Sequence, residues 1–404
     1  MKQKRDLTQY ALILYTIFIV FADNTLLFYL GTAVFGLCET IIIFKERKIK
    51  IDKFVLIYLA VIMFFALCVI MGATMFPSIS IKRCIVMLMN LVMGSFVVRE
   101  LIDEEKRRRF FEKYCIVALA FEIYVMISSG SRLFAGRLGE YAYSPIAFGG
   151  NYNANGVGIV LIYAFILCLG FYLEDRKKNR VVFMLVYIIG ILMTGSRKAI
   201  VSTVFALISL PLINIYYKEK NAFVHILKMI GLGIIVGILL FFALFKIPVL
   251  YYIAGYRIEA MLNIFGGTTV VVESSLDFRD QFIDCAKEVF RSSPIHGIGI
   301  DNFAQVNIIK GYYAHNNYWE LLAGGGIVGF SLYYLLYVYL IIRLWRQRKS
   351  DKPDVRTFLV FMLLMILMDN YLVSYLQHIC IFFLFITNAV VNSKPHEGRV
   401  RITI

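Results

Sequence analysis

The chain has 404 residues, and 60% of them are hydrophobic, against about 45–50% in soluble domains. Together with a mean hydropathy of +0.74, this excludes a soluble enzyme and predicts a single membrane domain over residues 1–404. The net charge of +15 lies mainly in short loops between apolar runs, a pattern of membrane topology and not of nucleic-acid binding.

The seven cysteines contain no Cys-x-x-Cys pair, and all but Cys285 lie in or beside apolar runs. This spacing gives neither a disulfide framework nor a zinc site. His296 and His315, in the longest polar segment, also lack a carboxylate at metal-ligand spacing. We therefore expect no metal and no cofactor.

Apolar runs alternate with charged loops along the chain, and a helix needs roughly 20 apolar residues to cross a bilayer. Their continuity favours helices over a β-barrel, which would show alternation. Twelve spans are predicted, over residues 10–44 (two spans, divided at Asp23 and Asn24), 55–71, 79–98, 110–129, 154–173, 181–193, 200–217, 224–245, 319–344, 358–372 and 374–391.

Alternate loops between these spans hold most of the 42 Lys and Arg residues. Because cytoplasmic loops are enriched in basic residues, both termini are predicted in the cytoplasm. The short break at 194–198 and the long segment 246–318 then lie on the outer side. The first two spans and the seventh are short, which leaves the number of spans open by one pair.

Four ionisable residues fall within or near spans, where such groups are costly unless they are paired. We expect structural pairing between helices for them. They are Glu39, Glu122, Lys228 and Asp369.

The long outer segment 246–318 contains one amphipathic stretch. Between Leu276 and Arg291, apolar residues recur close to helical spacing, and Pro294 ends the pattern. We expect a helix there that covers the membrane face of the protein as a lid. Arg279 lies in its first turn and is either a site residue or a solvated surface residue.

His315 stands at the junction of this segment with the next apolar helix. Asn317 is a candidate N-cap of that helix, and Glu320 is its candidate partner three residues later. The positive end of the helix would keep the imidazole neutral, as a general base requires. The alternative is an interfacial polar residue without a chemical role.

Arg197 lies in the break at 194–198, which is too short to carry a loop far from the bilayer. A buried arginine beside helix N–H groups suits a phosphate or diphosphate group, whereas simple snorkelling to the interface is the alternative. Further candidates for substrate binding are Arg137, in the polar loop 130–153, together with Tyr256 and Arg257.

Three blocks of residues occur in a fixed order. They are Thr194-Gly195-Ser196-Arg197, the segment from Arg279 through Pro294-Ile295-His296-Gly297-Ile298-Gly299-Ile300-Asp301-Asn302-Phe303, and His315-Asn316 followed by Leu322, Gly326 and Gly329. With the topology, they resemble the O-antigen ligase and Wzy-type polysaccharide polymerase superfamily. One departure is Phe282, where the family commonly has Trp.

This resemblance implies an all-α, GT-C-like polytopic protein of the bacterial cytoplasmic membrane, with its active site on the outer face. It implies a metal-independent, inverting glycosyltransferase that uses undecaprenyl-diphosphate-linked oligosaccharides as donor and acceptor. Carried over by position, Arg197 and Arg279 would hold the diphosphate and His315 would activate the acceptor hydroxyl. Apart from this resemblance, Asn316 and Glu320 are further candidates for substrate binding, because they lie close to His315 in the sequence.

Three functions follow as hypotheses. The first is a polymerase of lipid-linked repeat units, which would work with a chain-length regulator or other polysaccharide assembly proteins. The second is a ligase that transfers the glycan to another acceptor. The third is a lipid-oligosaccharide flippase, which would need polar residues along a path through both leaflets, whereas the candidates here gather on one face.

Overall fold

The computed structural model describes residues 2–22, 25–46, 52–133, 137–140, 142, 152–218, 274–350 and 352–393, with short stretches and single residues between 231 and 259. All regular structure in these parts of the chain is helical. The long helices are α1 (Lys2–Phe21), α2 (Leu26–Glu46), α3 (Lys53–Ile70), α4 (Pro77–Leu101), α5 (Glu104–Ser129), α6 (Ala154–Asp175), α7 (Lys178–Thr194), α8 (Arg197–Lys218), α12 (Ser274–Ser292), α14 (Asn317–Gln347), α15 (Pro353–Met368) and α16 (His378–Asn392).

The described helices overlap the predicted spans, but the bounds of α5, α15 and α16 differ from the predicted ones by several residues. Helices α2, α3, α4, α6, α8 and α14 are long and apolar enough to cross a membrane. Helices α1, α5, α7, α15 and α16 overlap the other predicted spans, except for the ninth, 224–245, most of which lies outside the described residues. The chain is therefore an integral membrane protein, and the count of twelve spans stays a prediction.

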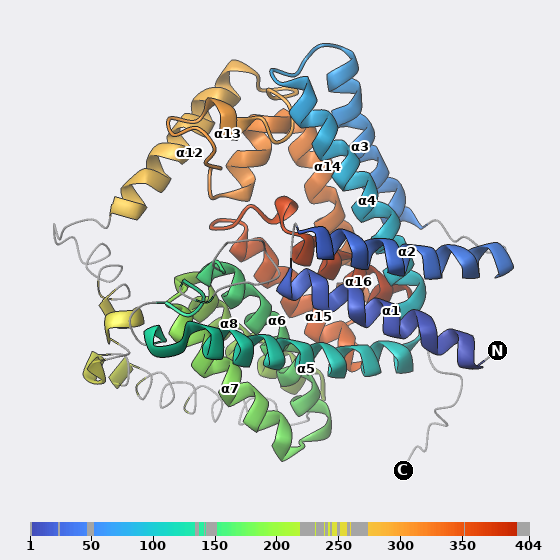
Figure 1. Cartoon of the computed structure of the whole chain (residues 1–404), viewed down its shortest axis with the longest axis vertical. Coiled ribbons are helices and arrows are strands. Elements are labelled where there is room, and N and C mark those ends of the chain that lie inside the picture. The colour runs from blue at the N-terminus through green and yellow to red at the C-terminus, as the bar shows by residue number, and fades with distance from the viewer. Residues whose placement is uncertain are drawn as a thin grey trace.

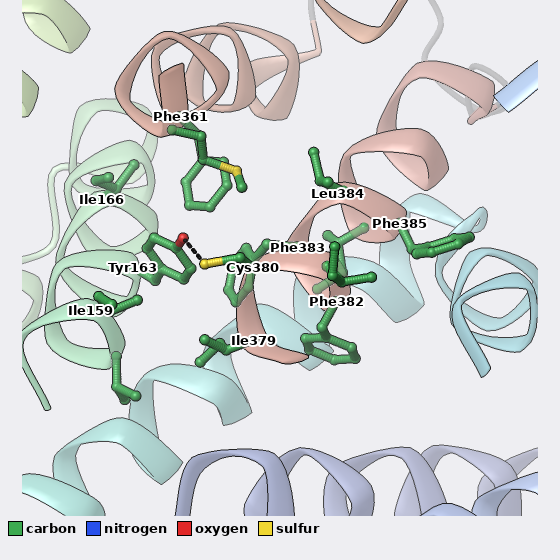
Figure 2. Close-up of a cluster of buried hydrophobic side chains, with 14 of the residues drawn as sticks. Ile159, Tyr163, Ile166, Phe361, Ile379, Cys380, Phe382, Phe383, Leu384 and Phe385 are labelled. Atoms are coloured by element: carbon green, nitrogen blue, oxygen red, sulfur yellow. Dashed lines mark hydrogen bonds between the residues drawn. The ribbon is translucent and has the colours of Figure 1, made fainter. Parts of the chain in front are cut away.

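The core of the bundle lies around α6 and α16, which are buried on nearly every side. A helix that is apolar all round belongs in such a central position. Figure 2 shows Tyr163 of α6 pointing at Cys380 of α16, with the hydroxyl oxygen 3.2 Å from the sulfur atom. Phe361 of α15 stacks on Phe383 of α16, with ring centroids 5.1 Å apart, so aromatic packing joins the three helices.

The remaining helices pack around this core in two groups (Figure 1). Helix α6 contacts α5, α7, α8 and α15, whereas α3 packs against both α4 and α14. Helix α12 and the short α13 (Phe303–Val306) lie beside α14. This arrangement places the segment that precedes α14 in contact with α12.

Two of the four ionisable groups in or near the spans form polar contacts between helices, as expected. Arg99 of α4 binds the buried carboxylate of Glu39 of α2 over 2.7 Å. Asp369, which follows α15, accepts a hydrogen bond of 2.8 Å from the hydroxyl of Tyr334 in α14. The expected pairing is not found for Glu122, which packs against Gly190 of α7 with neither carboxylate oxygen hydrogen-bonded among the described residues. Lys228 lies outside the described residues.

Candidate active site

His315 lies in the loop before α14 and is partly buried. Its ring stacks against that of Phe282 of α12, with centroids 6.1 Å apart. Burial, followed by the positive charges of Arg279 and Lys198, lowers the pKa of His315 to about 4. The imidazole is therefore neutral at pH 7, as the sequence predicted, but burial and two cations are the cause.

Helix α12 is the amphipathic helix expected from the sequence. Its Phe282 and Ala286 are buried, whereas Phe278 at its start is exposed. Ala286 belongs to a small apolar cluster with Ala314 and Ala323, which come from the segment around the start of α14. This cluster packs α12 against α14. Because His315 directly precedes α14, the packing brings Arg279 of α12 close enough for its charge to lower the pKa of His315.

The break between α7 and α8 is a sharp turn. Helix α7 ends at Gly195, whose left-handed backbone (φ 56°) suits a residue without a side chain. The hydroxyl of Thr194 donates to the carbonyl of Ile191 over 2.6 Å and accepts from the backbone N–H of Ser196 over 3.2 Å. These bonds fix the point at which α8 begins, at Arg197.

Lys198, in the first turn of α8, brings a second cation to the site. It lies within electrostatic range of Arg279, of Arg137 and of His315. Within the described parts of the chain, no carboxylate pairs with it. Its neighbour Arg197 is partly buried at the same helix end. Lys198 of α8 and Arg279 of α12 thus both act on a neutral imidazole, an arrangement that suits an anionic ligand.

Arg137 holds the break from the side of the loop before α6. Its Nε donates to the carbonyl oxygen of Thr194 over 2.7 Å, and Nη2 donates to Oδ1 of Asn155 over 3.0 Å. The carboxylate of Glu140 lies 3.5 Å from Nη1. Arg137 is therefore a structural clamp on the end of α7 as well as a charge near Lys198.

The second and third sequence blocks meet through their backbones. Helix α14 breaks at Gly326, whose φ of 58° is not helical. The carbonyls of Ala323 and Gly324, which the break frees, accept hydrogen bonds of 3.0 and 2.9 Å from the amides of Ile298 and Gly299. A broken helix leaves unpaired backbone groups, and the 294–299 loop satisfies them here.

Helix α4 holds the other side of this loop. Both Nε and Nη2 of Arg83 bind Oδ2 of Asp301, over 2.9 and 2.7 Å. Ser80 donates to the carbonyl oxygen of Ile300 over 3.1 Å, and the amide of Met75 donates to that of Ile298 over 2.8 Å. The loop before His315 is thus fixed between α4 and α14.

The prediction that Asn317 caps α14 is wrong, because the N-cap is Asn316. The side chain of Asn316 accepts hydrogen bonds from the amides of Tyr318 and Trp319, over 3.0 and 3.2 Å. Asn317 is buried instead, and its amide donates to the carbonyl oxygen of Asp369 over 2.7 Å. The asparagine next to His315 is therefore the one that starts the helix.

Glu320 does not close the predicted capping box, in which its carboxylate would bind the N-cap amide. It is buried, and Oε2 accepts a hydrogen bond from the amide of Ala314 over 2.7 Å. The other two candidates add little to the geometry. Tyr256 is partly buried in a short described stretch, and Arg257 lies outside the described residues.

Lys198 and Phe282 are the residues that sequence reasoning missed as parts of the site. Lys198 follows the motif arginine directly, and two successive cations in so short a break were the available signal. Phe282 was noted as part of the apolar stripe and as a departure from the family pattern, and its position one helical turn after Arg279 puts both on one face of α12.

Comparison with known protein families finds a match. Residues 181–334 match the model of a family described as O-antigen ligase. No match was found among curated proteins. The matched region contains the α7–α8 break, α12, the 294–299 loop and the first half of α14, which together carry all three blocks of the resemblance. Over residues 181–334 the chain is therefore similar to the O-antigen ligase family, in agreement with the resemblance carried by the three sequence blocks.

Proposed function

We propose that the protein is a glycosyltransferase that polymerises lipid-linked oligosaccharide repeat units on the outer face of the bacterial cytoplasmic membrane. Its donor and acceptor are glycans carried on undecaprenyl diphosphate. One observation carries the proposal: a neutral imidazole, His315, lies within the field of two cations, Arg279 and Lys198, that come from different helices. This pairs a base with stabilisers of negative charge.

The reaction is a single displacement at the anomeric carbon of the donor. The acceptor hydroxyl gives its proton to His315 as its oxygen forms the new bond to that carbon. The bond from carbon to the diphosphate oxygen breaks at the same time, and the leaving lipid diphosphate keeps the electron pair. Attack from the opposite side inverts the configuration, and no oxidant or other reactant is needed.

Arg279 and Lys198 stabilise the charge that builds up on the leaving diphosphate. Such preorganised charges are worth roughly 10²–10³ in rate for each group removed, and a general base contributes roughly 10²–10⁴. Arg197 adds a third cation from the same helix end. Arg137 supports this end through its bond to Thr194.

A base with a pKa of about 4 is weak in the free protein. Donor binding makes His315 a stronger base, because the diphosphate brings negative charge next to the two cations that lower the pKa of His315. An opposite charge nearby favours the protonated form of a histidine, so donor binding raises this pKa. The base therefore becomes stronger when the donor is bound.

The residues around His315 have supporting roles. Asn316 starts α14 and binds the carbonyl oxygen of Asn370 over 3.2 Å, which ties the site to the segment after α15. Tyr256 and Arg257 remain candidates for contacts with the glycan, on the sequence alone. A chain-length regulator or another polysaccharide assembly protein is the expected partner.

Transfer of the glycan to a different acceptor is the second candidate function. The description of the matching family as O-antigen ligase favours it. The chemistry at His315 is the same in both cases, because only the molecule that carries the acceptor hydroxyl differs. The distinction therefore rests on the acceptor and requires an assay that offers both kinds.

The test is turnover of purified protein in liposomes with a lipid-linked oligosaccharide, in the presence of EDTA. We expect wild type to form a ladder of products and His315→Ala to form it roughly 10²–10⁴ times more slowly. Turnover only after a separate acceptor is added identifies a ligase. Movement of the lipid-linked glycan across the bilayer without any transfer would reject the enzyme in favour of a flippase.

Two controls keep this result specific. His296→Ala removes the other histidine of the same segment, which bonds to Ser293 and Gly297 and not to the site cations. It should leave the product ladder intact. A ladder formed by His315→Ala at the wild-type rate would show that the imidazole is not the base.

A further inference from the structure

Glu320 is an acid that the proposed reaction does not use. Only 1% of its surface is exposed. Its Oε2 accepts the hydrogen bond from the amide of Ala314, and Oε1 has no hydrogen-bond partner among the described residues. Arg83 acts on it only at longer range, because this arginine binds Asp301. Burial of an acid without a hydrogen-bond partner is costly, so the hydrogen bond from Ala314 is the contact that stabilises the buried carboxyl group of Glu320.

That bond lies next to a strained residue. His315 has a left-handed backbone, with a φ of 52°, which is unfavourable for a residue with a side chain. Such a conformation persists only where the surroundings hold it. On one side the amide group of Asn316 binds the carbonyl oxygen of Asn370, and on the other Glu320 binds Ala314. The two attachments bracket the histidine.

We infer that Glu320 is a positioning residue for His315, which its carboxyl group holds in place through the backbone of Ala314. This inference rests on the proposed function. It gives Glu320 a supporting role in place of the substrate contact expected from the sequence. The imidazole then keeps its stacking against Phe282 and faces the acceptor hydroxyl in a fixed orientation.

Two substitutions separate the hydrogen bond from the charge. Glu320→Gln keeps a carbonyl oxygen that can accept from Ala314, whereas Glu320→Leu has a similar size and no acceptor. Glu288→Gln, at an exposed position of α12, serves as the control for loss of a carboxylate nearby. For each protein, kcat and the KM values for donor and acceptor are measured, together with hydrogen exchange of the backbone over residues 310–318.

We expect Glu320→Leu to lose about 100-fold in kcat, because a small displacement of a catalytic group has that effect, with both KM values within about twofold of wild type. Its amides over 310–318 should exchange faster. Glu320→Gln should retain kcat within about tenfold, since a neutral acceptor still bonds but more weakly, and should keep the pH profile of wild type.

The inference is overturned if folded Glu320→Gln is as impaired as Glu320→Leu, because charge and not the hydrogen bond would then matter. A rise in the acceptor KM at unchanged kcat would also overturn it, since that marks a substrate contact. If Glu320→Leu does not fold, Glu320→Gln decides alone. A wild type without transfer rejects the proposed function, and the exchange rates still show whether Glu320 fixes this loop.

Discussion

The amide of Gly299 donates a hydrogen bond to the carbonyl oxygen of Gly324 over 2.9 Å, at the break in α14. Beside it, the amide of Ile327 donates to the carbonyl oxygen of Pro294 over 2.8 Å. Two motifs that are separate in the sequence are therefore the two halves of one backbone junction. The loop replaces the partners that α14 loses where its helical geometry stops.

The first prediction concerns this junction. Gly326→Ala places a methyl group on a left-handed backbone and into the main chain of Ile295. We expect the unfolding free energy to fall by about 3 kcal/mol or more, because backbone strain and overlap add. Thermal unfolding in detergent measures this. Gly311→Ala is the matched control, since its φ of 90° is also left-handed but a methyl group there meets open space. If both variants lose the same unfolding free energy, close packing of Gly326 against Ile295 is not the cause of the loss.

The second prediction concerns the clamp at the end of α7. Arg137→Lys keeps the charge, but one ammonium group cannot reproduce the two directed bonds to Thr194 and Asn155. We expect a loss of about 1–3 kcal/mol in stability and a higher KM for the donor. Arg132→Ala, at an exposed position of the same loop, should change neither. Donor binding at wild-type strength in Arg137→Lys would show that the charge alone suffices.

The third prediction concerns pH. The pKa of His315 is lowered from 6.5 to about 4, so the neutral base persists as the pH falls and is lost only near pH 4. The acid limb of kcat/KM, which reports the free protein, should therefore lie near pH 4. The acid limb of kcat should lie at higher pH, because the bound diphosphate raises this pKa. Coincident limbs near pH 6.5 would contradict both the burial and the cations as causes.

The fourth prediction tests Lys198 as one of those cations. Lys198→Gln removes a positive charge near His315, so the pKa of His315 rises and the acid limb of kcat/KM moves to higher pH. The donor KM should rise about tenfold or more through loss of a charge-assisted bond. Arg291→Gln, at an exposed position near the end of α12, should leave both unchanged. An unmoved acid limb in Lys198→Gln would place this lysine outside the site.

Much of the fold could be predicted because membrane helices follow from hydropathy and loop charge. The long helices α3, α6 and α14 overlap the predicted spans closely, and the amphipathic α12 follows from the spacing of its apolar residues. A bilayer forces each apolar run to satisfy its own backbone, so local sequence is sufficient there.

The details of the site needed the tertiary structure. Asn316 and Asn317 are chemically identical neighbours, and only the contact of Asn317 with Asp369 decides which of them caps α14. Arg197 and Lys198 are successive residues at the start of α8, so their side chains point in different directions. The sequence alone did not show which of the two acts on His315. The role of Gly324 and Gly326 depends on the backbone of the 294–299 loop, which lies far earlier in the sequence, and no local pattern encodes such a partner.

The most direct measurement is donor binding and turnover in the same preparation of His315→Ala. If His315 is the base and the cations hold the diphosphate, this variant should bind the lipid-linked donor as tightly as wild type. Its turnover should nevertheless fall by a factor of roughly 10²–10⁴, the usual contribution of a general base. Turnover at the wild-type rate would contradict the assignment, and so would an equal loss of binding and turnover, because His315 would then act by holding the substrate.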